Sequence, residues 1–122
     1  MAENEGLGTI KIANEVVAII ASLAASEIDG VSSMSGGVGS GIAEMFGQKK
    51  GVKVETGEDE CVVDLSVIIE YGISIPEVAE NIQKNVKEAI ESMTGLNAVE
   101  INVHVQGVHF TNNEEYVEKS EL

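Results

Sequence analysis

Residues 61–106 read CVVDLSVIIEYGISIPEVAENIQKNVKEAIESMTGLNAVEINVHVQ and contain the pattern that decides the fold. Cys61–Tyr71 alternates apolar and polar side chains, which predicts a strand. Ser74-Ile75-Pro76-Glu77 has the form of a capping box with proline in the first turn, which opens a helix. Apolar side chains then recur at helical spacing as far as Gly95, and alternation returns over 99–106. The stretch therefore predicts a strand, a helix and a second strand.

Each of these three elements has a predicted core face. In the first strand we expect it to consist of Val63, Leu65, Val67, Ile69 and Tyr71. In the helix it consists of Val78, Ile82, Val86, Ala89, Ile90 and Met93, and in the last strand of Val99, Ile101, Val103 and Val105. The opposite face of the helix carries glutamate and lysine at i,i+4 spacing, which is typical of a solvated surface.

Residues before this stretch predict a second helix and more strands. Asn14 offers an N-cap and Gly30 a stop, so we expect a helix over 15–29, preceded by a short strand at 9–12. A short strand follows that helix, then the Gly-rich loop at 35–41, then a hairpin that pairs Val52–Glu55 with the strand 61–71. The order predicts an α+β two-layer sandwich in which two main helices pack on a small mixed sheet. We expect one domain over 8–110, a loose segment at 1–7 and an acidic tail at 111–122.

The predicted helix 15–29 is apolar nearly all round. Only Glu15, Ser22, Ser26, Glu27 and Asp29 are polar in it. Such a helix is buried on several sides. Either a loop or another helix covers its back, or the surplus apolar surface binds a partner or a second copy of the chain.

Composition restricts the classes of function. The formal charge is −14, from 21 acidic residues against seven lysines and no arginine, so the chain repels nucleic acid and anionic membranes. A single cysteine excludes an intramolecular disulfide and a thiolate metal cluster within one chain. The acidic first residues do not resemble a secretory signal, and the longest apolar run, 16–25, is too short to span a bilayer. These features predict a cytoplasmic protein that is at most tethered to a membrane by something else.

The residues offer little chemistry. The Gly-rich loop lacks the lysine and the Ser/Thr of a phosphate-binding P-loop. His104 and His109 would need Asp64 or Glu70 from across the sheet to hold a metal, and a solvated strand histidine is the simpler interpretation. No Ser-His-Asp or Cys-His pattern is present. We therefore predict no enzyme and no catalytic, cofactor or metal residues.

Two interaction hypotheses remain after that exclusion. The first is a protein contact through the helix 15–29 and the segment after the Gly-rich loop, for which the candidate residues are Ile42, Met45, Phe46, Lys49 and Lys50. The second, from another class, is an RNA-binding KH-like module. It would use the GXXG pattern at 36–39 with Lys49 and Lys50 as a basic patch.

Five blocks of sequence resemble one known family. They are Gly8–Ala13, Gly51–Val54, Tyr71–Val78, Met93–Leu96 and Val99–Val108. In this order they resemble the alkaline shock protein family of Gram-positive bacteria over about residues 7–110. The resemblance implies a non-enzymatic cytoplasmic protein of the cell-envelope stress response, often clustered beneath the membrane by an anchored partner, with some relatives linked to control of lipid synthesis. It implies protein partners and homo-oligomers, and no catalytic residues to carry over.

Overall fold

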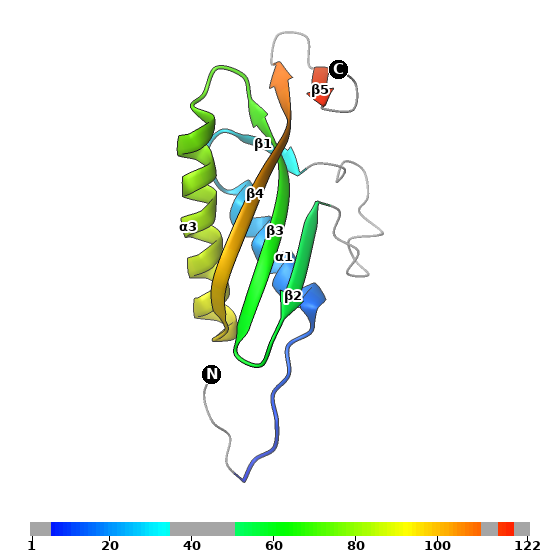
Figure 1. Ribbon diagram of the computed structural model, residues 1–122, viewed down its shortest axis with the longest axis vertical. Helices are drawn as coiled ribbons and strands as arrows, with labels where there is room; N and C mark the ends of the chain where they lie inside the picture. Colours follow the sequence, from blue (N-terminus) through cyan, green and yellow to red (C-terminus); the bar gives the residue numbers. More distant parts are fainter. Residues whose placement is uncertain (1–5, 35–50, 111–114, 119–122) are drawn as a thin grey trace.

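The computed structural model describes residues 6–34, 51–110 and 115–118. They form two layers, a sheet and a pair of helices packed on it (Figure 1). The elements are α1 (Asn14–Ser26), β1 (Val31–Met34), β2 (Val52–Thr56), β3 (Glu60–Glu70), α3 (Ile75–Thr94), β4 (Asn97–Phe110) and β5 (Glu115–Glu118). The predicted α+β two-layer fold is confirmed.

The sheet is mixed. Its order is β1-β3-β4-β5, and β2 also pairs with β3. β3 and β4 are parallel and joined by α3, whereas the other pairs are antiparallel. β2 lies along Cys61–Leu65 and β1 along Val67–Ile69, so the two share one edge of β3. The predicted hairpin between β2 and β3 is confirmed, and β3 is the central strand.

The core is aliphatic and lies between the helices and one face of the sheet. In β3, Val63, Leu65, Val67 and Ile69 have no exposed surface. From α3 the core receives Val78, Ile82, Val86 and Ile90, as predicted. From α1 it receives mostly small residues, Val17, Ile20, Ala21, Ala24 and Ala25. The alanines allow the α1 backbone to lie close to its neighbours.

Three residues expected in the core lie outside it. Tyr71 is 69% exposed because β3 ends one residue earlier, and its ring contacts Phe110 at a centroid distance of 5.0 Å. Met93 in the last turn of α3 is also 69% exposed. The irregularity in β4 between Ala98 and Glu100 turns Val99 outward, and Ala98 takes the core position opposite Cys61. The predicted core face of the last strand is therefore correct only from Ile101 onward.

The predicted ends of the elements need correction. Residues 9–12 form no strand, since this segment runs beyond the end of the sheet and no strand of the described residues is available to pair with it (Figure 1). α1 ends at Ser26 rather than at residue 29, and Gly30, with φ of +103°, lies in the turn to β1. Ser74 is the N-cap residue of α3, but its side chain makes no capping hydrogen bond. Within the predicted acidic tail, β5 pairs antiparallel with the end of β4.

Candidate functional site

The face of α1 that points away from the core is apolar. Val16 is 46% exposed and Leu23 58% exposed, and Ile19 between them is half-buried. These three positions follow each other at helical spacing, so they form one stripe on the helix. We call Val16, Ile19 and Leu23 the α1 stripe. These side chains form part of the surplus apolar surface that we expected from the sequence of this helix.

Hydrogen bonds tether α1 near both ends. At its start, Thr56 Oγ1 of β2 donates to Asn14 Oδ1 at 2.9 Å. Asn14 therefore lies within the helix and holds it to the sheet, and the prediction that its side chain caps the helix is wrong. At the other end, Asn85 Nδ2 of α3 donates to the Ala24 carbonyl oxygen at 2.8 Å. The stripe is thus presented by a helix with a fixed position.

The other predicted contact residues lie outside the described parts of the chain. Ile42, Met45, Phe46, Lys49 and Lys50 all fall in the interval 35–50. The same holds for the GXXG pattern of the KH-like alternative. Both assignments stay predictions.

The face of the sheet opposite the helices carries the two histidines. Asp64 Oδ1 accepts a hydrogen bond from Asn102 Nδ2 at 3.1 Å and lies 3.4 Å from His104 Nε2. Glu70 Oε1 lies 3.4 Å from His109 Nδ1. Among the described side chains, Asp64 thus lies beside His104 and Glu70 beside His109. Among residues 6–34, 51–110 and 115–118, no three His, Cys, Asp or Glu side chains come together as metal ligands would.

Cys61 lies in the core, where it is 1% exposed. Burial, with the negative charge of Glu91, raises the pKa of its thiol despite the opposing effect of Lys87. The thiolate is the nucleophilic form of cysteine, so this environment suppresses its reactivity.

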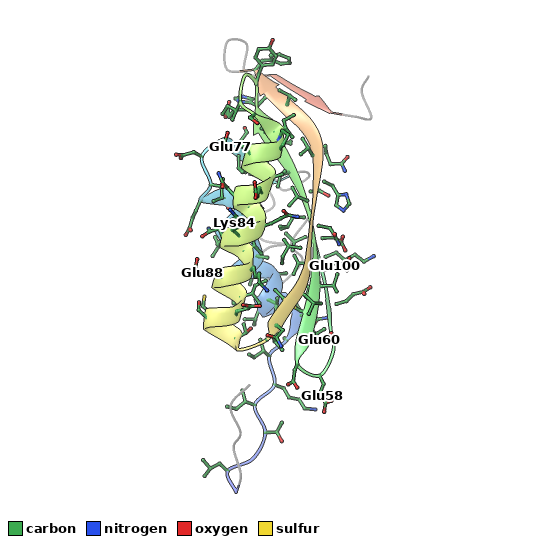
Figure 2. The ribbon with its side chains drawn as sticks, turned by 60° about the vertical axis from the view of Figure 1, so that its left-hand side comes forward. Glu58, Glu60, Glu77, Lys84, Glu88 and Glu100 are labelled. Atoms are coloured by element: carbon green, nitrogen blue, oxygen red, sulfur yellow. The ribbon has the colours of Figure 1, made fainter. Side chains whose placement is uncertain are left out.

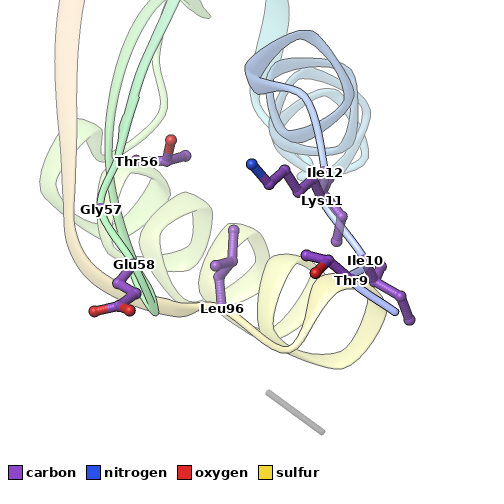
Figure 3. A pocket seen from close by; sticks show the side chains of 8 residues that line it. All are labelled: Thr9, Ile10, Lys11, Ile12, Thr56, Gly57, Glu58 and Leu96. Atoms are coloured by element: carbon purple, nitrogen blue, oxygen red, sulfur yellow. The ribbon is translucent and has the colours of Figure 1, made fainter. Parts of the chain in front are cut away.

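A hollow of about 470 Å³ lies at the end of the molecule where α1 begins (Figure 3). It lies between the segment 9–12, the β2–β3 turn at 56–58 and Leu96. Lys11 extends across it, whereas the carboxylate of Glu58 points away. One lysine among mainly apolar and hydroxyl groups specifies no ligand or reaction.

Comparison with known proteins identifies the family. Residues 2–110 match the model of the alkaline shock protein 23 family, which is described by its cell envelope-related function. The chain belongs to this family. The match covers nearly the whole described structure and confirms the family predicted from the sequence blocks.

Individual relatives come from Gram-positive bacteria. The chain is 41% identical over 111 residues to the uncharacterized protein YqhY of Bacillus subtilis, which covers 88% of this chain and 82% of that protein. It is 34% identical to YloU of the same organism, over 86% of this chain and 92% of the relative. A stress response regulator gls24 homolog of Streptococcus pyogenes is 29% identical, over 80% of this chain and 57% of the relative.

A solved structure shares the fold. A single-residue variant of MamM-CTD superposes with a TM-score of 0.51 and 13% identity, over 80% of this chain and 99% of that one. At this identity the likeness concerns the arrangement of helices and strands alone. Functional inference for this chain therefore rests on the family and on its own surfaces.

Proposed function

We propose that this chain is a non-enzymatic cytoplasmic interaction protein of the cell-envelope stress response, which self-associates and docks a membrane-anchored partner. The α1 stripe carries the proposal. These apolar side chains are exposed and aligned on a fixed helix. Binding of another protein that covers them is therefore favourable. The family's cell envelope-related function supplies the setting.

Membrane association in this proposal occurs through the partner. None of the helices in the described parts of the chain is long and apolar enough to cross a bilayer. The charge of −14 opposes direct adsorption on anionic lipid. The same charge opposes self-association, so we expect self-association to strengthen as salt screens the repulsion. A link to lipid-synthesis control stays a prediction of the family resemblance.

The contribution of the α1 stripe to the free energy of association can be calculated from the exposed fraction of its side chains. Burying a whole Val or Leu side chain is worth about 1.5–3 kcal/mol, and roughly half of each of Val16 and Leu23 remains to be covered. Covering both contributes about 2 kcal/mol, which corresponds to an affinity change of about 30-fold. Substituting both residues should therefore weaken association measurably.

The experiment compares two double variants. Val16→Ser with Leu23→Ser removes the apolar ends of the α1 stripe. Ile75→Ser with Met93→Ser is the control, because it removes exposed apolar side chains from α3. Sedimentation measures self-association, and fractionation of cells measures the share of the chain that pellets with membranes.

The proposal predicts that the α1 variant loses self-association and leaves the membrane pellet although it still folds, as a cooperative unfolding transition would show. The control should retain both properties. If the α1 variant associates and pellets like the control, the stripe is not the contact surface and the proposal fails.

A further inference from the structure

One edge of the sheet is incompletely paired. β4 pairs with β3 along nearly its whole length, but on its other side it pairs with β5 only over Gly107–Phe110. Among the described residues, no strand lies on that side of 97–106. Figure 2 shows this stretch of β4 beside α3, with Glu100 on it. An open edge of this kind is a template for another strand.

The hydrogen bonds at this edge show which backbone groups point outward. Gln83 Nε2 of α3 donates to the Ile101 carbonyl oxygen at 2.9 Å, so the backbone groups of Ile101 point away from β3. Backbone direction alternates along a strand, which places the N–H and C=O groups of Val103 and Val105 on the same outward side. The regular parallel register of β3 with Asn102–Val105 supports this alternation. No described group accepts from or donates to Val103 or Val105 on that side.

Side chains of α3 cap the rest of the open edge. Lys87 Nζ donates to the Ala98 carbonyl oxygen at 3.2 Å, and the Ala98 N–H donates to Glu91 Oε2 at 3.1 Å. Lys87, Glu91 and Gln83 thus provide hydrogen-bond partners for the outward backbone groups at 98–101, and β5 pairs with residues 107–110. What remains is a short window, residues 102–106 of β4, which we call the β4 window.

The side chains around the β4 window differ between its two faces. On the helix side, Val103 and Val105 pack on the core without being fully buried, and Val99 is 52% exposed. A shallow groove of about 270 Å³ lies below them, and it is lined by Gln83, Lys84 and Lys87 of α3 and by Ala98, Val99 and Ile101 of β4. On the opposite side of the sheet, Glu100 is exposed and Asp64 half-exposed. On the helix side an added strand would therefore meet valine side chains and, at the groove, the lysines of α3. On the other side it would meet Glu100 and neutral polar side chains.

We propose that the β4 window binds an extended segment of a partner protein as an added strand, with lysine or arginine toward Glu100 and β-branched side chains toward α3. β-strand addition gains its affinity from main-chain hydrogen bonds and its specificity from alternate side chains. β5 shows that this edge of β4 accepts an antiparallel strand. A basic segment is complementary to Glu100 beside the window and to the chain's charge of −14.

The test is amide hydrogen exchange measured by NMR on the full chain. In the free protein, the amides of Val103 and Val105 should exchange fast, whereas those of Asn102 and His104, which point toward β3, should exchange slowly. A short peptide of alternating lysine and valine should slow exchange at Val103 and Val105 by about tenfold or more. A peptide with glutamate in place of lysine should protect them less.

Two controls separate strand addition from other binding. The same lysine-valine peptide with N-methyl groups on the amides that face the protein cannot form the ladder and should give no protection. Val103→Pro should abolish the effect and leave the fold intact, since it removes an outward N–H, whereas His104→Pro removes an inward one and should destabilise the sheet.

Three results would overturn the proposal. The first is that no peptide protects these amides even at millimolar concentration. The second is that the N-methylated peptide protects them equally. The third is that the amides of Val103 and Val105 are already protected without peptide. If this protection depends on protein concentration, a second copy fills the window. If deletion of 111–122 removes the protection, the chain's own C-terminal segment fills the window.

Discussion

Replacing Asn85 tests how α1 is held in place. Asn85 Nδ2 donates to the Ala24 carbonyl oxygen at 2.8 Å and lies 3.3 Å from Glu27 Oε1. The last four carbonyls of a helix have no partner within it, and α1 ends at Ser26, so Asn85 satisfies a group that the helix leaves open. Asn85→Ala removes that bond and should cost about 1 kcal/mol of unfolding free energy.

Asn85→Asp should lower the unfolding free energy more than Asn85→Ala does, although it keeps the shape of the side chain. The introduced carboxylate cannot donate, and it would face a carbonyl oxygen and the carboxylate of Glu27. We expect a loss of about 2–3 kcal/mol from the missing bond and the repulsion. For a domain of this size 1 kcal/mol shifts the melting temperature by roughly 4 °C. The alanine variant should then melt about 4 °C, and the aspartate variant about 8–12 °C, below the parent at pH 7.

Thermal and urea unfolding of the three proteins measure these differences. At low pH the introduced carboxylate becomes protonated and can donate, so the aspartate variant should recover relative to the alanine variant. Equal stability of the two variants at pH 7, or no loss in either, would refute the assigned role of Asn85 at the end of α1.

Further predictions concern a glycine and two titratable groups. Gly30→Ala should cost about 2–3 kcal/mol, since φ is +103° and the added Cβ would lie 2.9 Å from Val78 Cγ2; urea unfolding measures it, and parental stability would contradict it. The hydrogen bond from Lys87 lowers the pKa of Glu91 below its usual value, and the hydrogen bond from the Ala98 N–H lowers it further. The Glu91 carboxylate therefore stabilises the fold at neutral pH, and this stabilisation is lost as the pH falls through the lowered pKa. Glu91→Gln should therefore destabilise at pH 7 and flatten the acid limb of the stability curve, and an unchanged curve would argue against this linkage. Burial raises the pKa of Cys61, so a thiol reagent at pH 8 should label the native chain slowly and the urea-unfolded chain fast, whereas equal rates would show that the thiol is accessible.

Local patterns predicted the extent of α3 well because most of its local signals agree with the tertiary structure, although Ser74 makes no capping hydrogen bond and Met93 lies outside the core. Its proline, its terminal Gly95 and its apolar spacing all follow from short-range physics. One face of β3 is predictable for the same reason, since Val63, Leu65, Val67 and Ile69 alternate along it, whereas the burial of Ile68 is not part of that pattern. Residues 9–12 carry a similar short alternation, but no strand in the described part of the chain lies beside them. Strand pairing depends on the register of the whole sheet, which a short segment does not encode.

Long-range polar contacts were the least predictable part of the structure. Asn14 has the sequence context of a cap, yet it bonds to Thr56, which lies 42 positions away. The sequence suggested Asp64 or Glu70 as possible neighbours of the histidines. The register places Ser66 opposite His104, so the contact of His104 with Asp64 is diagonal. The surplus apolar surface of α1 was visible in composition, but only packing shows that Val16 and Leu23 stay outside the core.

The open edge of β4 could not be read from side chains. Its alternation of Ile101, Val103 and Val105 with polar residues is that of any strand with one buried face. Whether a neighbour pairs on each side depends on where β5 and α3 lie. Hydrogen bonds from α3 to this edge come from Gln83 and Lys87, and the local pattern assigns Lys87 to a solvated helix face.

Site-specific photo-crosslinking in cells under envelope stress tests the central claim most directly. A photoreactive amino acid at Leu23 lies on the α1 stripe, and one at the exposed Glu88 on α3 is the matched control. The proposed function predicts that the probe at Leu23 gives a crosslinked dimer of the chain and an adduct in the membrane fraction, whereas the probe at Glu88 gives neither. Absence of both products at Leu23, or the same products at both positions, would contradict the claim that the outer face of α1 is the contact surface.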